Sequence, residues 1–193
     1  MVLLVVLVPA CQAKPEAKYP TSLTPCELLP REAAVRVTDV GTKLGAGQAK
    51  ESHVLIRYKY CEWYYRQPRA HVWSAYRPGP VERRLTIRVS VIPAGRHGAD
   101  GAAGEYQSER DSRVGDGAVV ADLSGPGEEA FLTSDEFGGR TTAQLTFRRS
   151  NAVVTVELSG RDCCRGTGEM RSANRRKLLI AAATAADHTL LTR

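Results

Sequence analysis

The feature that most limits the fold of this chain is a pair of alternating apolar segments separated by three turn-forming residues. Ala143, Leu145 and Phe147 alternate with polar residues, and after Arg149-Ser150-Asn151 the pattern returns at Ala152, Val154, Val156 and Leu158. Such alternation places the apolar side chains on one face of two antiparallel strands. Asn tolerates the positive φ that tight turns need. We therefore expect a hairpin with one face in a hydrophobic core.

Further strands are expected upstream. The segment 85–91 alternates as cleanly as the hairpin, and 53–66 resembles a long strand whose phase changes near Cys61, which predicts a β-bulge there. Shorter strands are expected at 119–123 and 128–132.

Helices are expected at both ends of the chain. Pro25 fits the first position of a helical turn, and Pro30 ends that turn and begins a second helix to about residue 37. The segment 172–191 is rich in Ala and Leu, with Ala182, Ala186 and Leu190 at helical spacing. A short helix is expected at 104–113. Together these elements predict an α+β fold, with an antiparallel sheet of about five strands and N-terminal and C-terminal helices packed on it.

The first eleven residues carry information about location. Val2 to Val8 is an unbroken apolar run, followed by Pro9, Ala10 and Cys11. Seven apolar residues cannot span a bilayer, which needs roughly 20, but they suit the apolar part of a short signal peptide. The segment Val8-Pro9-Ala10-Cys11 resembles the lipobox of bacterial lipoproteins. This resemblance implies that Cys11 is diacylated and becomes the mature N-terminus.

These observations give an expected domain organisation. Residues 1–10 are the lipoprotein signal segment, 11–23 a lipidated tether rich in Pro, Lys, Glu, Ser and Thr, and 24–193 a single globular domain. No Lys or Arg precedes the apolar run, so we expect the true start codon to lie upstream. The expected location is the outer face of the cell membrane, where the lipid holds the protein.

The chain has a net charge of +6, with 27 basic and 21 acidic residues. The basic residues are scattered among acids and are not interleaved with aromatics, which argues against a nucleic-acid partner. Attraction to anionic headgroups is more compatible with an anchored protein. The expected partners are therefore the membrane, through the lipid anchor, and an envelope protein or wall polymer.

Five cysteines are present. With Cys11 lipidated, Cys26, Cys61, Cys163 and Cys164 remain, and four cysteines allow three disulfide connectivities. Outside the cytoplasm they are free to pair. We favour Cys26 with Cys61, which would close a long loop. Cys163 and Cys164 are adjacent, so a bond between them would be strained and would add little stability.

The sequence contains no Gly-x-Ser-x-Gly, His-Glu-x-x-His or phosphate-binding Gly loop. We therefore predict no catalytic residues, no metal site, no cofactor and no small-molecule substrate, and expect a non-catalytic binding or interaction module. One alternative is a thiol-redox or metal-handling protein that uses Cys163 and Cys164, because Arg161 and Arg165 would favour thiolates. Another is a solute-binding lipoprotein, which would need a concave site. Aromatic residues from Trp63 to Tyr76 belong either to such a surface or to the core.

Several motifs, taken in order, resemble a family of small actinobacterial lipoproteins of unassigned function. The Pro-Cys-x-Leu-Leu motif is matched at 25–29, Cys-x-Trp at 61–63, a Gly-Asp-Glu-Ala-Phe-like segment at 127–131, and Arg-x-x-Asn-x-x-Val-x-Val at 148–156. The resemblance spans roughly Pro25 to Leu191. It implies a disulfide between Cys26 and Cys61 and a PsbP-like α+β sandwich. The Cys163-Cys164 pair is outside the family pattern.

Overall fold

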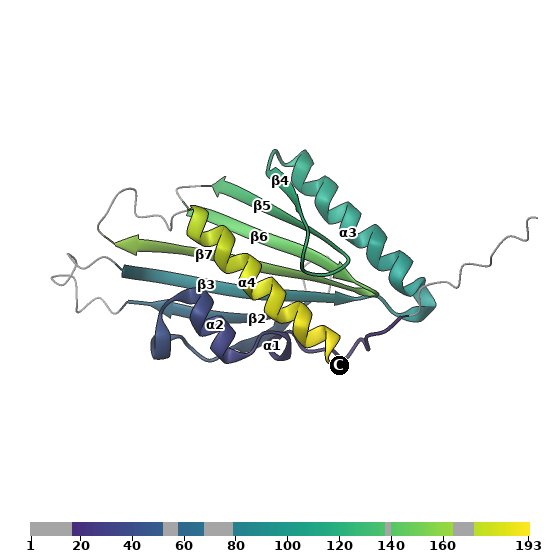
Figure 1. Cartoon of the computed structure of the whole chain (residues 1–193), viewed down its shortest axis with the longest axis horizontal. Helices are drawn as coiled ribbons and strands as arrows, with labels where there is room; N and C mark the ends of the chain where they lie inside the picture. Colours follow the sequence, from purple (N-terminus) through teal and green to yellow (C-terminus); the bar gives the residue numbers. More distant parts are fainter. Residues whose placement is uncertain (1–16, 52–57, 68–78, 138–139, 164–171) are drawn as a thin grey trace, which may run out of the picture.

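The computed structural model describes residues 17–51, 58–67, 79–137, 140–163 and 172–193. Its strands form one antiparallel sheet in the order β1-β2-β3-β7-β6-β5-β4 (Figure 1). The strands are β1 (Gln48–Glu51), β2 (Lys59–Arg66), β3 (Gly79–Val91), β4 (Val119–Leu123), β5 (Glu129–Phe137), β6 (Arg140–Arg149) and β7 (Ala152–Cys163). The prediction of an antiparallel α+β fold is therefore confirmed. The prediction of about five strands is wrong, because the sheet has seven.

Four α-helices surround the sheet within the described residues: α1 (Pro25–Leu28), α2 (Arg31–Thr38), α3 (Gly98–Gly115) and α4 (Ser172–Leu191). Short 3-10 turns, η1 (Gly41–Lys43) and η3 (Ala94–Arg96), lie between elements. Figure 1 shows α4 lying across the middle of the sheet, with α1 and α2 beside it. The expected helices at both ends of the chain are thus present.

The main core lies between the sheet and α1, α2 and α4. The alternating apolar residues of β6 and β7 point into it, including Leu145, Phe147, Val154 and Val156, which are fully buried. From α4, the side chains that pack on the sheet are Leu179, Ala182, Ala183, Ala186 and Leu190. Three of the five are alanines, so the helix axis lies close to the sheet. The hairpin and the Ala- and Leu-rich C-terminal helix are therefore confirmed.

The opposite face of the sheet carries a smaller core beneath α3. Ala102 and Tyr106 of α3 pack there on Phe131 of β5 and Val153 of β7. Successive strand residues face opposite sides, so Phe131 and Val153 belong to the face that the main core does not use. The helix is longer than the 104–113 that the sequence predicted, because it begins at Gly98 and ends at Gly115.

The β6–β7 turn departs from the expected geometry. Ser150, not Asn151, has the positive φ, at 50°. Asn151 is instead fully buried. Its side-chain oxygen accepts hydrogen bonds from the backbone N–H groups of Lys18 and Tyr19, at 2.9 and 2.8 Å. Its amide nitrogen donates to the carbonyls of Tyr19 and Ile92, both at 2.9 Å.

This amide fixes part of the segment expected to be a tether. Tyr19 and Leu23 are also buried in the main core. Residues 17–23 therefore pack against the folded body, and the prediction that the tether extends to residue 23 is wrong. The physical reason is that burial of Tyr19 and Leu23 stabilises the packed segment, while Lys18, Thr21 and Ser22 remain exposed and hydrated.

The prediction of a β-bulge in β2 is wrong. Its register with β3 is continuous from Lys59 opposite Val89 to Arg66 opposite Glu82, so no bulge occurs near Cys61. The irregularity of β3 lies instead between Pro80 and Glu82, in its pairing with β7. Within 58–66 a single alternation holds: Cys61 and Trp63 are buried, whereas Tyr60 lies on the other face. The upstream part of the expected strand, 53–57, lies outside the described residues.

Candidate functional site

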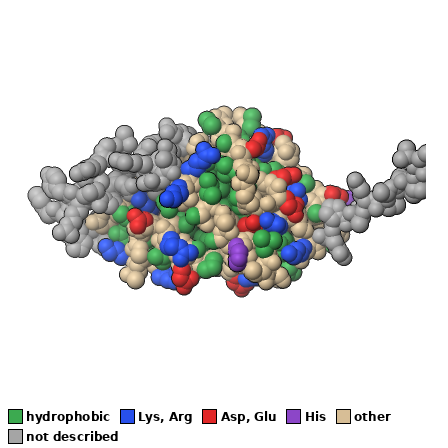
Figure 2. Space-filling view, in the orientation of Figure 1, with side chains coloured by type: hydrophobic (Ala, Val, Ile, Leu, Met, Phe, Trp, Pro, Cys, Tyr) green, Lys and Arg blue, Asp and Glu red, His purple; other side chains and the backbone are tan. Residues whose placement is uncertain are grey.

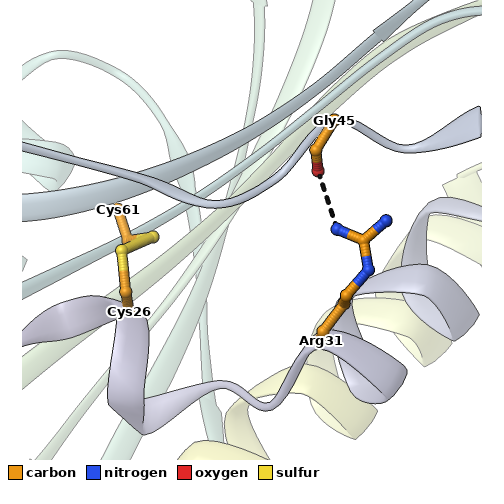
Figure 3. The surroundings of a disulfide bond; sticks show 4 residues. All are labelled: Cys26, Arg31, Gly45 and Cys61. Carbon is orange, nitrogen blue, oxygen red and sulfur yellow. Dashed lines mark hydrogen bonds between the residues drawn. A yellow bond between two sulfur atoms is a disulfide. The ribbon is translucent and has the colours of Figure 1, made fainter.

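Cys26 of α1 and Cys61 of β2 form a disulfide, with sulfurs 2.08 Å apart and Cα atoms 5.0 Å apart. The bond joins α1 to the core face of the sheet, where Cys61 is fully buried (Figure 3). Nearby, Arg31 of α2 donates hydrogen bonds to the carbonyls of Leu44 and Gly45, at 3.1 and 3.4 Å. Helix α2 and the segment before β1 are thereby held on the same side as the disulfide.

Tight packing extends from the disulfide to Gly47. A Cβ on Gly47 would lie 2.7 Å from Trp63 Nε1 and 3.0 Å from Cys61 Sγ. Glycine is therefore required there by the close approach of the backbone to the Trp63 ring. Trp63 and Tyr65 are both buried, whereas Tyr64 between them is 40 % exposed. Of the two alternatives for these aromatics, the core location is correct for Trp63 and Tyr65.

The other cysteines of interest lie at the limits of the described chain. Cys163 ends β7, where its backbone pairs with Gly79 of β3. Cys11 and Cys164 lie outside the described residues, as do Trp73 and Tyr76. Because Cys26 and Cys61 bond to each other, the connectivities that would join either one to Cys163 or Cys164 do not occur in this structure.

A polar groove lies on the face of the sheet opposite the disulfide. Helix α3 packs over β4, β6 and β7, and the groove occupies the neighbouring surface of β2, β3 and β7. Its volume is about 240 Å³, and its lining consists of Tyr58, Tyr60, Glu62, Arg84, Thr86, Arg88, Thr155 and Glu157. None of these residues was singled out as a site residue by the sequence analysis.

The strand register sets the groove floor. Across β2, β3 and β7, Tyr60 lies opposite Arg88, which in turn lies opposite Thr155. In the adjacent row, Glu62 lies opposite Thr86, and Thr86 lies opposite Glu157. A threonine thus stands between two carboxylates, with Arg84 and Arg88 two positions away on either side along β3.

Ion pairs hold the charged residues of the groove in place. Glu62 accepts from Lys50 of β1 and from Arg84, both at 2.9 Å. Arg88 donates to Glu109 of α3 at 3.0 Å, and its guanidinium lies 4.9 Å from the centre of the Tyr58 ring. Both arginines of the groove therefore already have a carboxylate partner.

At the side of the groove next to α3, two arginines determine the electrostatic environment of Glu109. Burial alone would raise the pKa of Glu109, but hydrogen bonds and charge from Arg113 and Arg88 outweigh it and hold that pKa below its usual value. Beside this pair, a smaller hollow of about 80 Å³ is lined by Glu105, Ser90 and Val153 and shares Tyr58, Arg88 and Thr155 with the groove. The two hollows are therefore adjacent.

The groove residues on β7 are hydrogen-bonded to residues of β6. Thr155 and Thr146 are linked through their hydroxyls at 3.1 Å. Glu157 accepts a hydrogen bond from Gln144 at 3.0 Å. The groove thus presents fixed donors and acceptors with an aromatic wall at Tyr58 and Tyr60, whose ring centres are 6.0 Å apart.

The sequence did contain a signal for this site. Thr86 and Arg88 alternate with the buried residues of β3, and Tyr60 and Glu62 do the same in β2. Alternation identifies such residues as facing away from the main core, but it does not reveal which strands are neighbours. The pairing of β3 with both β2 and β7 brings the outward-facing residues of the three strands together.

The described residues also bear on two other kinds of site. Among them, no group of three or more His, Cys, Asp or Glu side chains is arranged to hold a metal ion. No helix in that part of the chain has the length and apolar character to cross a membrane. In comparisons with known proteins, no family model and no curated protein matches the chain.

Proposed function

We propose that the protein is a lipoprotein held on the outer face of the cell membrane through Cys11, and that its folded body is a non-catalytic module that binds a ligand. The observation that carries the binding role is the polar groove on β2, β3 and β7, whose lining residues are ordered by strand pairing and ion pairs. Binding sites are concave surfaces with a few fixed polar groups. The groove also favours the solute-binding form of this proposal.

The disulfide supports the proposed compartment. Cysteines pair in oxidising environments and are kept reduced in most cytosolic proteins. The Cys26–Cys61 bond joins α1 to β2 across the core. The lipobox-like segment ending at Cys11 and the resemblance to small lipoproteins add to this support.

The position of the N-terminal segment relates the proposed anchor to the groove. Lys18 and Tyr19 bond to Asn151 at the β6–β7 turn, and Val91 pairs with Ala152 at the same end of the sheet. At about 3.4 Å per residue along β3, Arg88 lies roughly 10 Å from Val91 and Arg84 roughly 24 Å. The groove therefore begins close to the end of the sheet where Lys18 and Tyr19 lie and runs away from it.

The anchor is tested by metabolic labelling of the native cells with a fatty-acid analogue. The protein should be labelled, and Cys11→Ser should remove the label. Cys163→Ser is the matched control and should leave labelling unchanged. Labelling that persists in Cys11→Ser would reject acylation at Cys11.

The binding role is tested separately by adding solubilised envelope fractions to the ¹⁵N-labelled full chain in detergent. The backbone amide signals of Thr86, Arg88 and Thr155 should shift, while those of α2 should not. Shifts confined to other regions, or none with any fraction, would contradict a ligand-binding role for the groove.

A second candidate function is thiol-redox or metal-handling chemistry at Cys163 and Cys164. The observation that favours it is the pairing of Cys26 with Cys61, which leaves these two cysteines for another use. Thiol titration of the native protein should then find two accessible thiols that are lost in the double variant to serine. Two unreactive thiols would remove this candidate.

A further inference from the structure

We propose that the groove binds a neutral saccharide chain, lying along β2 and β3. This inference rests on the proposed binding function and names its ligand class. It follows from three properties of the groove: its charge balance, its combination of aromatic and planar polar groups, and its open form.

The charge balance of the groove favours a neutral ligand. Its lining holds two carboxylates, Glu62 and Glu157, and two guanidinium groups, Arg84 and Arg88. Each arginine is already paired, one with Glu62 and the other with Glu109. An anionic ligand would have to compete with these carboxylates, at a cost in free energy. A ligand without net charge can bond to the outer edges of the same groups while the pairs stay intact.

The polar groups of the floor match a ligand rich in hydroxyls. A hydroxyl both donates and accepts, so it needs donors and acceptors side by side. Arg84 and Arg88 supply donors, Glu157 supplies acceptors, and Thr86 between them supplies both. In the part of the chain described, Glu157 accepts a single hydrogen bond, from Gln144, and a carboxylate has room for several more. Planar guanidinium and carboxylate groups also suit the bidentate contacts that neighbouring hydroxyls can make.

The tyrosines of the groove provide apolar surface on which sugar rings can pack. A pyranose ring has C–H faces that pack on aromatic rings, while its hydroxyls point outward; tyrosine combines an apolar ring with a polar tip. Tyr58 and Tyr60 are adjacent at one wall of the groove. Tyr64 continues the row on the same face of β2, and its side chain is 40 % exposed.

The open form of the groove favours a chain over an enclosed small molecule. Pockets for small molecules are mostly apolar and have volumes of roughly 300–1,000 Å³. This groove is polar, with a volume of about 240 Å³. Alternate residues along a strand are about 7 Å apart, so the row from Tyr58 to Tyr64 extends over roughly 20 Å. An extended oligosaccharide can follow that row while its outer side remains hydrated.

The experiment titrates the ¹⁵N-labelled full chain, in a detergent without a sugar headgroup, with defined probes. The saccharides are maltohexaose, cellohexaose, mannohexaose and chitohexaose. Inorganic phosphate and spermidine serve as anionic and cationic probes. We expect at least one hexasaccharide to shift the amide signals of Tyr60, Thr86 and Thr155, and the matching disaccharide to bind more weakly.

Variants connect those shifts to the groove. Tyr60→Ala should weaken binding by about tenfold or more, and Tyr60→Trp should retain it, because an indole offers a larger face. Glu157→Gln should also weaken binding, while Glu32→Gln on α2 is the matched control with unchanged affinity. The spectrum of each variant shows whether it remains folded.

Three outcomes would overturn this ligand class. They are the absence of groove shifts with every hexasaccharide, shifts that Tyr60→Ala leaves unchanged in a folded variant, and groove shifts caused by phosphate or spermidine alone. If envelope fractions still shift the groove signals in any of these cases, the binding function stands and only the saccharide assignment fails.

Discussion

Arg149 of β6 and Asp187 of α4 form an ion pair with two hydrogen bonds between a strand and the helix that crosses it. Arg149 Nε and Nη2 both donate to the Asp187 carboxylate, the second at 2.9 Å. Asp187 is 6 % exposed. The hydrogen bond to Asp187 raises the pKa of Arg149. The two hydrogen bonds of the pair fix the position of α4 on the sheet.

Removing one partner of this pair should destabilise the protein. Arg149→Ala leaves a nearly buried carboxylate without its guanidinium, and we expect a loss of about 3 kcal/mol in the free energy of unfolding. Combining Arg149→Met with Asp187→Leu should recover much of that loss. Urea denaturation followed by circular dichroism measures both. Arg110→Ala is the control: it breaks the exposed pair with Asp122 and should cost much less, because exposed ion pairs contribute little to stability. Equal losses for Arg149→Ala and Arg110→Ala would contradict this account.

The stability of the protein should depend on the hydrogen-bonding groups of Asn151 more than on the size of its side chain. Asn151→Ala leaves the buried N–H groups of Lys18 and Tyr19 without their acceptor, so we expect a loss of about 2–4 kcal/mol. Asn151→Asp keeps that acceptor but places an oxygen against the carbonyls of Tyr19 and Ile92. It should therefore also destabilise. Hydrogen exchange should show faster exchange at Tyr19 in both variants, and unchanged exchange in Asn151→Asp would show that the donor half of the amide is unimportant.

Reduction of the disulfide should lower stability by about 3–4 kcal/mol, because a loop with a sequence separation of 35 residues is released in the unfolded chain. Guanidinium denaturation with and without a phosphine reductant measures the difference. A double serine variant at Cys163 and Cys164 is the control and should show the same effect of reductant. If the reductant has no effect on that variant, the stabilisation comes from elsewhere.

Glu109 should contribute to acid sensitivity. Its pKa is below the usual 4.5 in the folded protein. Its contribution to stability is therefore present above pH 4.5 and is lost as pH falls through the lower, folded-state value. Glu109→Gln should lose about 1 kcal/mol at pH 7, and the difference from the parent should shrink as pH falls below 4.5. A constant difference between pH 7 and pH 3 would contradict this assignment.

The sequence predicted helices and strands best where one face of the element is apolar. The β6–β7 hairpin and the span of α4 followed from spacing alone, because burial of residues such as Phe147 and Ala186 determines which side faces the sheet. Strand β1 was missed because all four of its residues are exposed and it has no apolar alternation. It exists through backbone pairing with β2. Helix α3 was underestimated because it is rich in glycine, with a weak apolar stripe of Ala102 and Tyr106.

The candidate site could be predicted only in part. The pairing of Cys26 with Cys61 was expected and is present. The groove was not expected, since its residues come from three strands whose order depends on the crossing of the chain from β3 to β7. The role of Asn151 was also missed, because its partners at Lys18 and Tyr19 lie more than 130 residues away in sequence.

The polarity of β1 affects how copies of this protein behave beside one another. An outermost strand with unpaired backbone groups can recruit the same strand of a neighbour and start aggregation. Here the described part of that strand, Gln48–Glu51, is exposed throughout, and Lys50 and Glu51 place charges of both signs on it. A population of these molecules confined to a surface would thus be crowded without readily joining edge to edge.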